Sequence, residues 1–230
     1  MKAVLREARD LAPDVRHFVF EIQGVERFDF TPGQFVSLHG HLGGRQITRA
    51  YSLAAPPSGN RVELCLNRVE GGLFSPHLFT LVPGDTVELT GPAGYFVPKP
   101  AVRTTVLVAT GTGIAPFRAM LPSLLAAAAE PHMVTLLFGT RREESILYRE
   151  EWENWERRHG RFRFWPTLSR AGDSWTGRKG YVQASLKEAL GGSLEVDLFV
   201  CGLKAMVDEV RALAKSLGLD RKQIVYEKYD

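Results

Sequence analysis

Apolar and polar residues alternate with a period of two along short stretches of the first 97 residues, for example at 15–20 and 34–38. Successive side chains of a strand point to opposite faces, so this alternation predicts strands with one buried face. Turns that contain Pro and Gly, such as 31–33 and 82–85, separate these stretches. Short strands at this spacing predict an antiparallel β-barrel.

The pattern changes around Pro98-Lys99-Pro100, and strands and helices are expected to alternate from there on. A β-branched run at 105–109 precedes a Gly-rich turn and an alanine-rich helix that is expected to reach about residue 129. The further expected elements are strands at 134–138, 162–168 and 197–200 and helices near 148–158, 182–190 and 206–217. This order predicts an α/β doubly wound parallel sheet with ligands at the carboxyl ends of its strands. We therefore expect two domains, 1–98 and 99–230.

Composition narrows the possible chemistry. Cys65 and Cys201 are the only cysteines of the 230-residue chain, too few for a four-thiolate iron–sulfur cluster or a structural zinc site. Any redox chemistry therefore requires an organic cofactor. His39 and His41 have the spacing of a metal-binding pair, but no third ligand lies nearby in sequence. We expect solvated loop histidines there, and no metal.

Charge and hydropathy disfavour nucleic-acid and membrane partners. The net charge of +3 is small, and the basic residues are interspersed with acids. No apolar run approaches the ~20 residues of a membrane span, and the N-terminus lacks a signal-peptide core. The expected location is the cytoplasm.

The first candidate binding motif is Arg49-Ala50-Tyr51-Ser52, at the expected end of a strand. Alternation places Arg49 and Tyr51 on one face, where a cation suited to a phosphate lies beside an aromatic plane suited to a stacked ring. The Ser52 hydroxyl can donate to a ring nitrogen. Taken alone, the tetrad is a pattern that strands also produce by chance.

Two nearby segments extend this motif. One is Leu66-Asn67-Arg68-Val69, whose polar side chains alternatively form a solvated strand face. The other is Gly71-Gly72-Leu73-Phe74-Ser75, where a Gly-Gly turn can open a short helix. The free N–H groups of such a helix and the serine hydroxyl suit a pyrophosphate. The Phe74 ring is alternatively a core aromatic.

The second motif is a Gly-rich turn between a β-branched strand and a helix, Thr110-Gly111-Thr112-Gly113-Ile114-Ala115-Pro116. It supplies a tight turn, a backbone that a ligand can approach and a helix N-terminus for a dinucleotide pyrophosphate. Pro116 stands where the full Gly-x-Gly-x-x-Gly fingerprint has its third glycine. An ordinary tight turn is the alternative.

Basic residues and a cysteine follow the later strands. Arg141, Ser169-Arg170 and Arg178 are expected at or near the carboxyl edge of the sheet, unless they are ordinary surface arginines. Cys201-Gly202 ends another expected strand, where a buried thiol is alternatively just a small apolar residue.

These motifs and the ending Glu227-Lys228-Tyr229-Asp230 resemble, in order and spacing, the ferredoxin–NADP(H) reductase family over nearly the whole chain. The resemblance implies a flavin-binding barrel at 1–98 and an NADP(H)-binding domain at 99–230 whose tail returns to the flavin. It implies hydride transfer between NADP(H) and a flavin, FAD rather than FMN. It also implies single-electron exchange with an acidic ferredoxin or flavodoxin by a monomeric enzyme. The alternatives are a reductase component of an oxygenase or another electron-transfer chain, and a flavin or nucleotide sensor without turnover.

The resemblance also implies roles for residues of the first domain. Arg49 would pair with the flavin phosphate, Tyr51 would stack on the isoalloxazine and Ser52 would approach its N5 atom. Main-chain groups of two segments would cradle the ribityl chain and the pyrophosphate. The complete set of expected flavin contacts is Arg49, Ala50, Tyr51, Ser52, Leu66, Asn67, Arg68, Val69, Gly72, Leu73, Phe74 and Ser75.

The second domain receives the nucleotide and most of the catalytic roles by the same resemblance. Cys201 would border the nicotinamide C4 atom without acting as a nucleophile, Glu227 would place charge near the reacting rings, and the Tyr229 ring would cover the flavin face. Asp230 departs from both family endings used for comparison, which stop at the tyrosine or add a tryptophan. The expected nucleotide contacts are Gly111, Thr112, Gly113, Arg141, Ser169, Arg170, Arg178, Cys201, Gly202 and Tyr229, and the expected catalytic residues are Ser52, Cys201, Glu227 and Tyr229.

Overall fold

The computed structural model describes residues 1–99, 103–128 and 131–229. Its contacts divide the chain into two compact units. Unit 1 contains Met1–Pro98 together with Ala115–Met120, and unit 2 contains Lys99–Ile114 and the chain from Leu121 onward. Pro100 and Asp230, which the sequence analysis singled out, lie outside the described residues.

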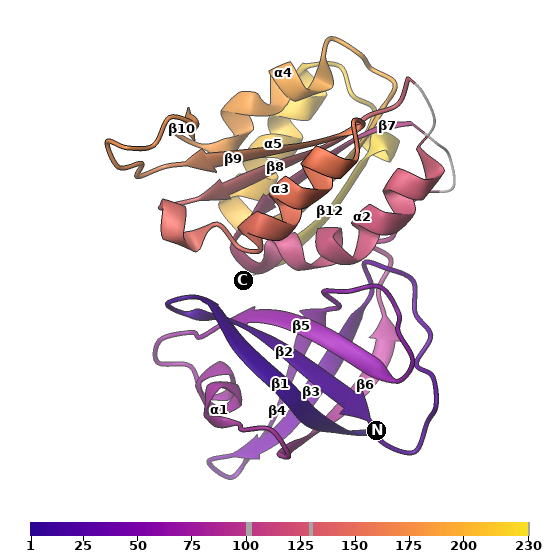
Figure 1. Ribbon diagram of the computed structural model, residues 1–230, viewed down its shortest axis with the longest axis vertical. Helices are drawn as coiled ribbons and strands as arrows, with labels where there is room; N and C mark the ends of the chain where they lie inside the picture. The colour runs from indigo at the N-terminus through magenta and orange to yellow at the C-terminus, as the bar shows by residue number, and fades with distance from the viewer. Residues whose placement is uncertain (100–102, 129–130, 230) are drawn as a thin grey trace. The chain divides into compact units, whose positions relative to one another are not determined.

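Unit 1 is built on a six-stranded antiparallel sheet in the order β4-β3-β6-β1-β2-β5 (Figure 1). Its elements are β1 (Lys2–Ala12), β2 (Val15–Ile22), β3 (Phe35–Leu42), β4 (Arg45–Ser52), β5 (Arg61–Asn67), β6 (Thr86–Ala93) and the helix α1 (Phe74–Thr80). The two edge strands approach each other, because Leu53 bridges to Leu64 and the Ala54 N–H donates to the Glu63 carbonyl at 2.8 Å. The sheet thus curls into the barrel that the alternation predicts.

The barrel interior is filled by the apolar members of the alternating strands. Phe18, Phe20, Leu38 and Leu64 are completely buried, and α1 adds Phe74 to the same core. Burying one side chain of this size stabilises the fold by roughly 1.5–3 kcal/mol. The period-two pattern therefore determines which face of each strand points inward.

Unit 2 is a six-stranded, wholly parallel sheet in the order β10-β9-β8-β7-β11-β12. Its strands are β7 (Thr104–Thr110), β8 (Val134–Thr140), β9 (Phe162–Leu168), β10 (Arg178–Lys179), β11 (Val196–Leu203) and β12 (Ile224–Tyr229). Its α-helices are α2 (Ala115–Ala127), whose first half belongs to unit 1, α3 (Arg149–Arg158), α4 (Leu186–Leu190) and α5 (Lys204–Ser216). Its described residues also include four short 3₁₀ helices: η1 (Gly111–Ile114), η2 (Glu143–Ser145), η3 (Val182–Ser185) and η4 (Arg221–Gln223).

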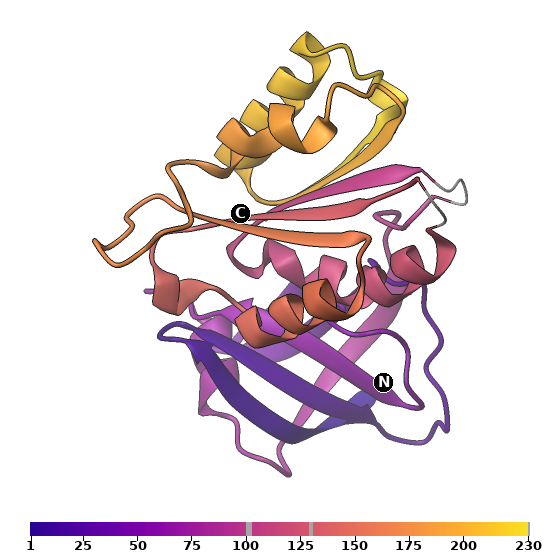
Figure 2. The same cartoon turned by 45° about the horizontal axis from the view of Figure 1, so that its top comes forward.

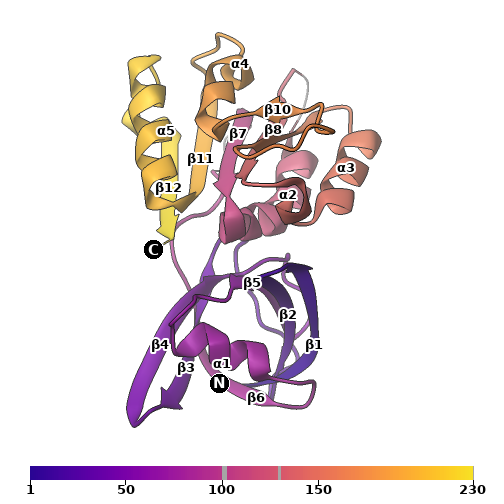
Figure 3. The same ribbon diagram turned by 90° about the vertical axis from the view of Figure 1, so that its left-hand side faces the viewer.

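Helices cover both faces of this sheet. Figures 2 and 3 show α3 on one face and α4 and α5 on the other. Beneath α4 and α5, the strand residues Val106, Val108 and Val200 belong to one buried cluster, to which α5 adds Val207. On the α3 face, the buried Trp152 packs against the rings of Phe162 and Phe164. This arrangement confirms the predicted doubly wound architecture. Because the strands are parallel, their carboxyl ends lie at one shared edge of the sheet.

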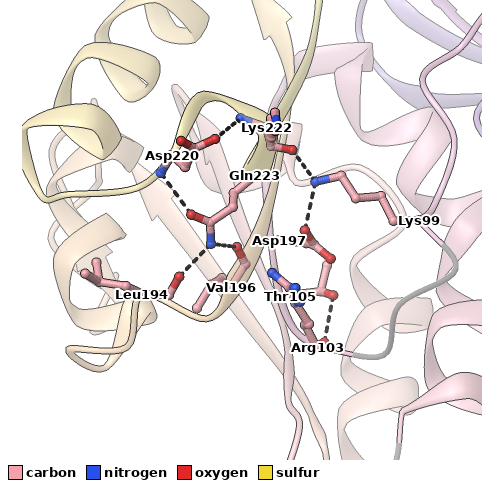
Figure 4. A network of polar contacts seen from close by, with 9 residues as sticks. All are labelled: Lys99, Arg103, Thr105, Leu194, Val196, Asp197, Asp220, Lys222 and Gln223. Atoms are coloured by element: carbon pink, nitrogen blue, oxygen red, sulfur yellow. Dashed lines mark hydrogen bonds and ion pairs between the residues drawn. The ribbon is translucent and has the colours of Figure 1, made fainter.

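The polar network in Figure 4 fastens the first residues of unit 2 to the opposite, amino edge of its sheet. The Asp197 carboxylate is buried at the start of β11, and the Lys99 ammonium donates to it at 2.8 Å and to the Lys222 carbonyl at 2.6 Å. The Gln223 side-chain amide donates to the Val196 carbonyl at 2.9 Å. Because an unpaired buried carboxylate is costly, Lys99 stabilises this corner of unit 2.

The α-helix expected to reach about residue 129 ends at Ala127, close to its expected end. Three other local expectations are wrong. The segment 182–190 begins as the 3₁₀ helix η3 and becomes the α-helix α4 only at Leu186. The final segment is a full edge strand in parallel register with β11, where the sequence analysis saw a tail. His39 and His41 lie on β3 and not in a loop, and the His39 ring has two side-chain partners there. Its two nitrogens contact the hydroxyls of Thr48 and Thr90, both at 2.9 Å.

Candidate functional site

The first group of candidate residues lies at the end of β4 in unit 1. The Arg49 side chain is exposed, and its guanidinium donates to the carbonyl of the preceding residue, Thr48, at 2.9 Å. Tyr51 is half-buried against the barrel core, and this burial raises its pKa to about 12 while the nearby Arg49 charge opposes the rise. The tyrosine hydroxyl therefore stays protonated at neutral pH. An available cation next to a ring fixed on one side by the core fits the phosphate and ring of a flavin.

Ser52 and the segment before α1 differ from the simplest expectation. Ser52 is buried, with 6% of its surface exposed. The Ser75 hydroxyl accepts the Val69 N–H at 2.9 Å, so it closes the loop that precedes α1. Leu73 is 59% exposed, and Gly71 is exposed with nothing within 4 Å of its Cβ position, so the backbone of this loop is accessible at Gly71.

Two predicted contact residues of unit 1 have side chains in the core. Leu66 and Phe74 are 2% and 4% exposed, because the pattern of β5 and the amphipathic α1 turn them inward. Asn67 is exposed, whereas the Arg68 guanidinium pairs with Asp14 at 2.9 Å. The solvated-face alternative thus describes both Asn67 and Arg68, whose side chain is 53% exposed. Any ligand contact by Leu66 or Phe74 has to come from the main chain.

The Gly-rich turn follows β7 in unit 2, as the sequence predicts. Gly111 has a positive φ of +54° and nothing within 4 Å of the position of a Cβ atom, so its backbone is open to a ligand. Gly113 is buried, and a Cβ there would lie 2.4 Å from the Cys201 carbonyl oxygen. The turn continues through η1 into α2, with no side-chain cap at the start of α2. These features fit the approach of a pyrophosphate to free helix N–H groups.

The end of β11 packs closely against the end of β7, where this turn begins. Gly202 has φ +135°, and a Cβ on it would lie 2.4 Å from the Thr110 hydroxyl. That hydroxyl accepts the Leu203 N–H at 3.1 Å. The two glycines therefore permit two strand ends to pack backbone against backbone, which an added methyl group would prevent.

Three of the four predicted catalytic residues lie on β11 and β12, next to this contact between the ends of β7 and β11. In the register of β11 and β12, Cys201 stands opposite Glu227 and Leu203 stands opposite Tyr229. Burial raises the pKa of the Cys201 thiol well above its usual value, the Glu227 charge raises it further, and a hydrogen bond from Tyr229 opposes both. The thiol therefore stays neutral. The fourth residue, Ser52, belongs to unit 1.

The predicted basic set lies at the carboxyl ends of β8 and β9. The Arg170 N–H donates to the Arg141 carbonyl at 2.8 Å, so the two loops that carry these arginines are joined. Both arginine side chains are exposed, and Ser169 is exposed next to them. Within the described ranges, neither guanidinium makes a hydrogen bond or an ion pair. Two available cations and a hydroxyl at this edge suit a phosphate group.

Arg178 shares this neighbourhood but is already paired. It stands opposite Thr167, near the carboxyl end of β9. Its guanidinium makes two hydrogen bonds of 2.7 Å to the Glu188 carboxylate and lies 3.9 Å from the centre of the Trp165 ring. Neither Glu188 nor Trp165 was predicted from sequence, because each is distant in the chain and belongs to no motif.

A second group that sequence reasoning missed lies within unit 1. The Glu63 carboxylate contacts Nε2 of the buried His17 at 3.3 Å and the Arg118 guanidinium at 2.7 Å. Hydrogen bonds from these partners lower the pKa of Glu63 to about 2, although burial opposes the shift. No group of three potential metal ligands occurs among the described residues.

Comparison with known proteins also separates a flavin-binding part of the chain from a nucleotide-binding part. An oxidoreductase FAD-binding domain matches residues 2–97, and an oxidoreductase NAD-binding domain matches residues 107–212. The fold and the sites therefore define a flavin- and nicotinamide-nucleotide-binding oxidoreductase. The chain is 43% identical to ferredoxin–NADP reductase B of Sorangium cellulosum, over 100% of this chain and 97% of that protein. It belongs to the ferredoxin–NADP reductase family.

Two other relatives show the breadth of that similarity. NADH-cytochrome b5 reductase 1 of Kluyveromyces lactis is 31% identical over 86% of this chain and 73% of its own length. The crystal structure of the Amycolatopsis cytochrome P450 reductase GcoB superposes with a TM-score of 0.89 at 29% identity, covering 99% of this chain and 69% of that one. No helix in the described part of the chain has the length and hydropathy to cross a membrane.

Proposed function

We propose that this protein exchanges electrons between NADP(H) and a ferredoxin or flavodoxin through a bound FAD. When bound, the flavin accepts or donates hydride at the nicotinamide and single electrons at the protein partner. A cytoplasmic, monomeric enzyme with an acidic partner is part of this proposal. The supporting features are the similarity to a ferredoxin–NADP reductase over the whole chain and the net charge of +3.

The observation that carries the NADP(H) proposal is the carboxyl edge of the unit 2 sheet. There the open Gly111 backbone follows β7, and the exposed Ser169 and Arg170 follow β9. We assign the pyrophosphate to the Gly111–Gly113 turn and the 2′-phosphate to Ser169, Arg170 and Arg178, with a contribution from Arg141. A charge-assisted hydrogen bond contributes about 1.5–3 kcal/mol. Even one such bond gives a preference on the order of tenfold for a nucleotide that carries the phosphate.

In unit 1 we assign the flavin phosphate to Arg49 and the ring to Tyr51. Accessible main-chain groups of the loop before α1 would hold the pyrophosphate. In unit 2 the neutral Cys201 would shape the nicotinamide position, Glu227 would supply charge, and the Tyr229 ring would shield the flavin until nicotinamide displaces it. The buried Ser52 would act through a hydrogen bond to the flavin ring.

A reductase that serves another electron acceptor is the second candidate. The similarity to a cytochrome P450 reductase and to NADH-cytochrome b5 reductase 1 favours it, because these names point to different acceptors and, in one case, to NADH. This candidate differs from the first in partner and coenzyme while sharing the flavin site.

One set of measurements tests these assignments. We expect the purified protein to be yellow and to release FAD on denaturation, as mass analysis of the released flavin will show. NADPH added without air should bleach the flavin band faster than NADH. Slow or absent bleaching by both coenzymes would indicate a sensor without turnover. Faster bleaching by NADH would exclude the NADP(H) assignment.

A matched pair of variants then locates the 2′-phosphate contact. Arg170→Ala should raise KM for NADPH about tenfold or more and leave NADH kinetics nearly unchanged, since NADH lacks the 2′-phosphate. Arg142→Ala is the control, because Arg142 is also exposed and makes only a 4.0 Å ion pair with Glu144. Equal losses with both coenzymes would indicate a folding role for Arg170.

A further inference from the structure

Arg178 differs from Arg141 and Arg170 at the carboxyl edge of unit 2 because its guanidinium is already paired with a carboxylate. Both terminal nitrogens of its guanidinium donate to Glu188, each at 2.7 Å, and one of them also lies 3.4 Å from the Ser185 hydroxyl. Arg141 and Arg170, in the same part of the sheet, have no such counter-charge within the described residues. One of the three cations proposed for a phosphate is therefore neutralised in advance.

From this pairing we infer that Glu188 limits the preference of the nucleotide site for a 2′-phosphorylated adenine nucleotide. This inference rests on the proposed function. A phosphate that reaches Arg178 has to displace the carboxylate or bind beside it. Displacement removes two charge-assisted hydrogen bonds, and binding beside the carboxylate places two anions close together. Either route reduces what Arg178 adds to phosphate binding.

The surroundings of Arg178 hold it in place independently of Glu188. Its guanidinium stacks on Trp165 at 3.9 Å, and the Trp175 indole N–H donates to its carbonyl at 2.9 Å. Stacking on an aromatic face restrains the plane of a guanidinium without using its N–H groups. Removing the charge of Glu188 therefore weakens the competition for the donors of Arg178, while Trp165 still restrains the side chain.

The size of the effect follows from exposure. The side chains of Arg178 and Glu188 are 32% and 59% exposed, so solvent screens the pair. Screening makes Glu188 a moderate competitor for Arg178. We therefore expect a change in phosphate affinity of about threefold to tenfold, which should shrink as the salt concentration rises.

Calorimetric titration of the full chain with adenosine 2′,5′-bisphosphate and with AMP tests the inference without catalysis. Glu188→Gln should tighten the bisphosphate by about threefold to tenfold and leave AMP unchanged. Glu195→Gln removes the same charge from an exposed acid whose side chain makes no hydrogen bond among the described residues, and it should change neither ligand. The gain should disappear when Arg178→Ala is added to Glu188→Gln.

Two outcomes would overturn the inference. Bisphosphate affinity that is unchanged or weaker in Glu188→Gln would mean that the acid positions Arg178 and does not compete for it. Arg170→Ala, titrated in parallel, separates this result from failure of the proposed function. If Arg170→Ala weakens the bisphosphate while Glu188→Gln does not tighten it, only the inference fails. If Arg170→Ala has no effect, the proposed phosphate site fails and the inference fails with it.

Discussion

The two units build their candidate sites in different ways. In unit 1, Arg49, Tyr51 and Ser52 come from the end of one antiparallel strand. In unit 2, the candidate residues come from the ends of several parallel strands, among them Gly111 directly after β7 and Cys201 of β11, which are far apart in sequence. A site on one strand depends on local alternation, whereas a site at a parallel edge depends on the packing that assembles the sheet.

The arginines proposed for phosphate binding show the same difference. Arg49 in unit 1 bonds only the neighbouring Thr48 carbonyl within the described residues, so its charge is available. Arg178 in unit 2 is held by Glu188, ten positions later in the chain. The antiparallel unit thus presents a cation that its own strand positions, while the parallel unit pairs one of its three candidate cations with an acid from another element, α4.

The largest expected effect tests whether packing controls the unit 2 site. Gly113→Ala places a Cβ atom 2.4 Å from the Cys201 carbonyl oxygen, so β7 and β11 have to move apart. We expect a loss of about 3 kcal/mol in unfolding free energy and a fall in Tm of roughly 6–12 °C, measured by thermal unfolding. Gly160→Ala is the control, because nothing lies within 4 Å of its Cβ position. An equal Tm for both variants would contradict the close-packing argument.

The next effect tests the simpler site of unit 1. Arg49→Ala removes an exposed cation without disturbing the core, so flavin affinity should fall on the order of 10- to 100-fold with little change in Tm. Flavin release measured by ultrafiltration and fluorescence gives the affinity. Arg45→Ala, also exposed on β4, should retain flavin as the parent does. Flavin retention that is the same in both variants would remove Arg49 from the site.

An effect of comparable size concerns Glu63. Its ion pairs with His17 and Arg118 show that unit 1 also contains contacts between residues far apart in sequence. Glu63→Gln leaves His17 and Arg118 without their carboxylate and should cost about 2 kcal/mol at neutral pH. Because folding lowers the pKa of Glu63 from 4.5 to about 2, the stabilisation is complete above pH 4.5 and is lost as the pH falls toward 2. Urea unfolding across this range should show the parent and the variant converging at low pH. A constant difference would mean that the Glu63 charge is not responsible.

The smallest effect concerns Tyr229, at the end of β12. Tyr229→Ser removes a ring that nicotinamide is proposed to displace, and a stacked ring contributes about 0.5–1.5 kcal/mol beyond area burial. Nicotinamide nucleotides should therefore bind about twofold to tenfold more tightly, with a smaller difference between NADPH and NADH. Equilibrium titration monitored by flavin absorbance measures both affinities. Tyr226→Ser, on the same strand and 43% exposed, is the control. Parent-like affinities and coenzyme ratio in Tyr229→Ser would exclude a gating role.

Local patterns determined much of this protein from sequence alone. Alternation at 15–20 and 34–38 predicted β2 and β3, and the β-branched run before Gly111 predicted β7 and the turn after it. These predictions succeeded because strand periodicity and the backbone freedom of glycine act over a few residues. The family resemblance succeeded for a related reason, since its motifs are short segments in a definite order.

Tertiary structure alone decided which side chains those motifs leave available. Phe74 lies in the core, Ser75 closes its own loop, and Arg178 is paired with Glu188, although each belongs to a predicted motif or stands beside one. The final segment became β12 because the edge of β11 offers unpaired backbone groups, which no local pattern reveals. A hydrogen bond or an ion pair depends on distances between groups that the chain brings together only when it folds, so sequence spacing identified the motifs and packing determined their partners.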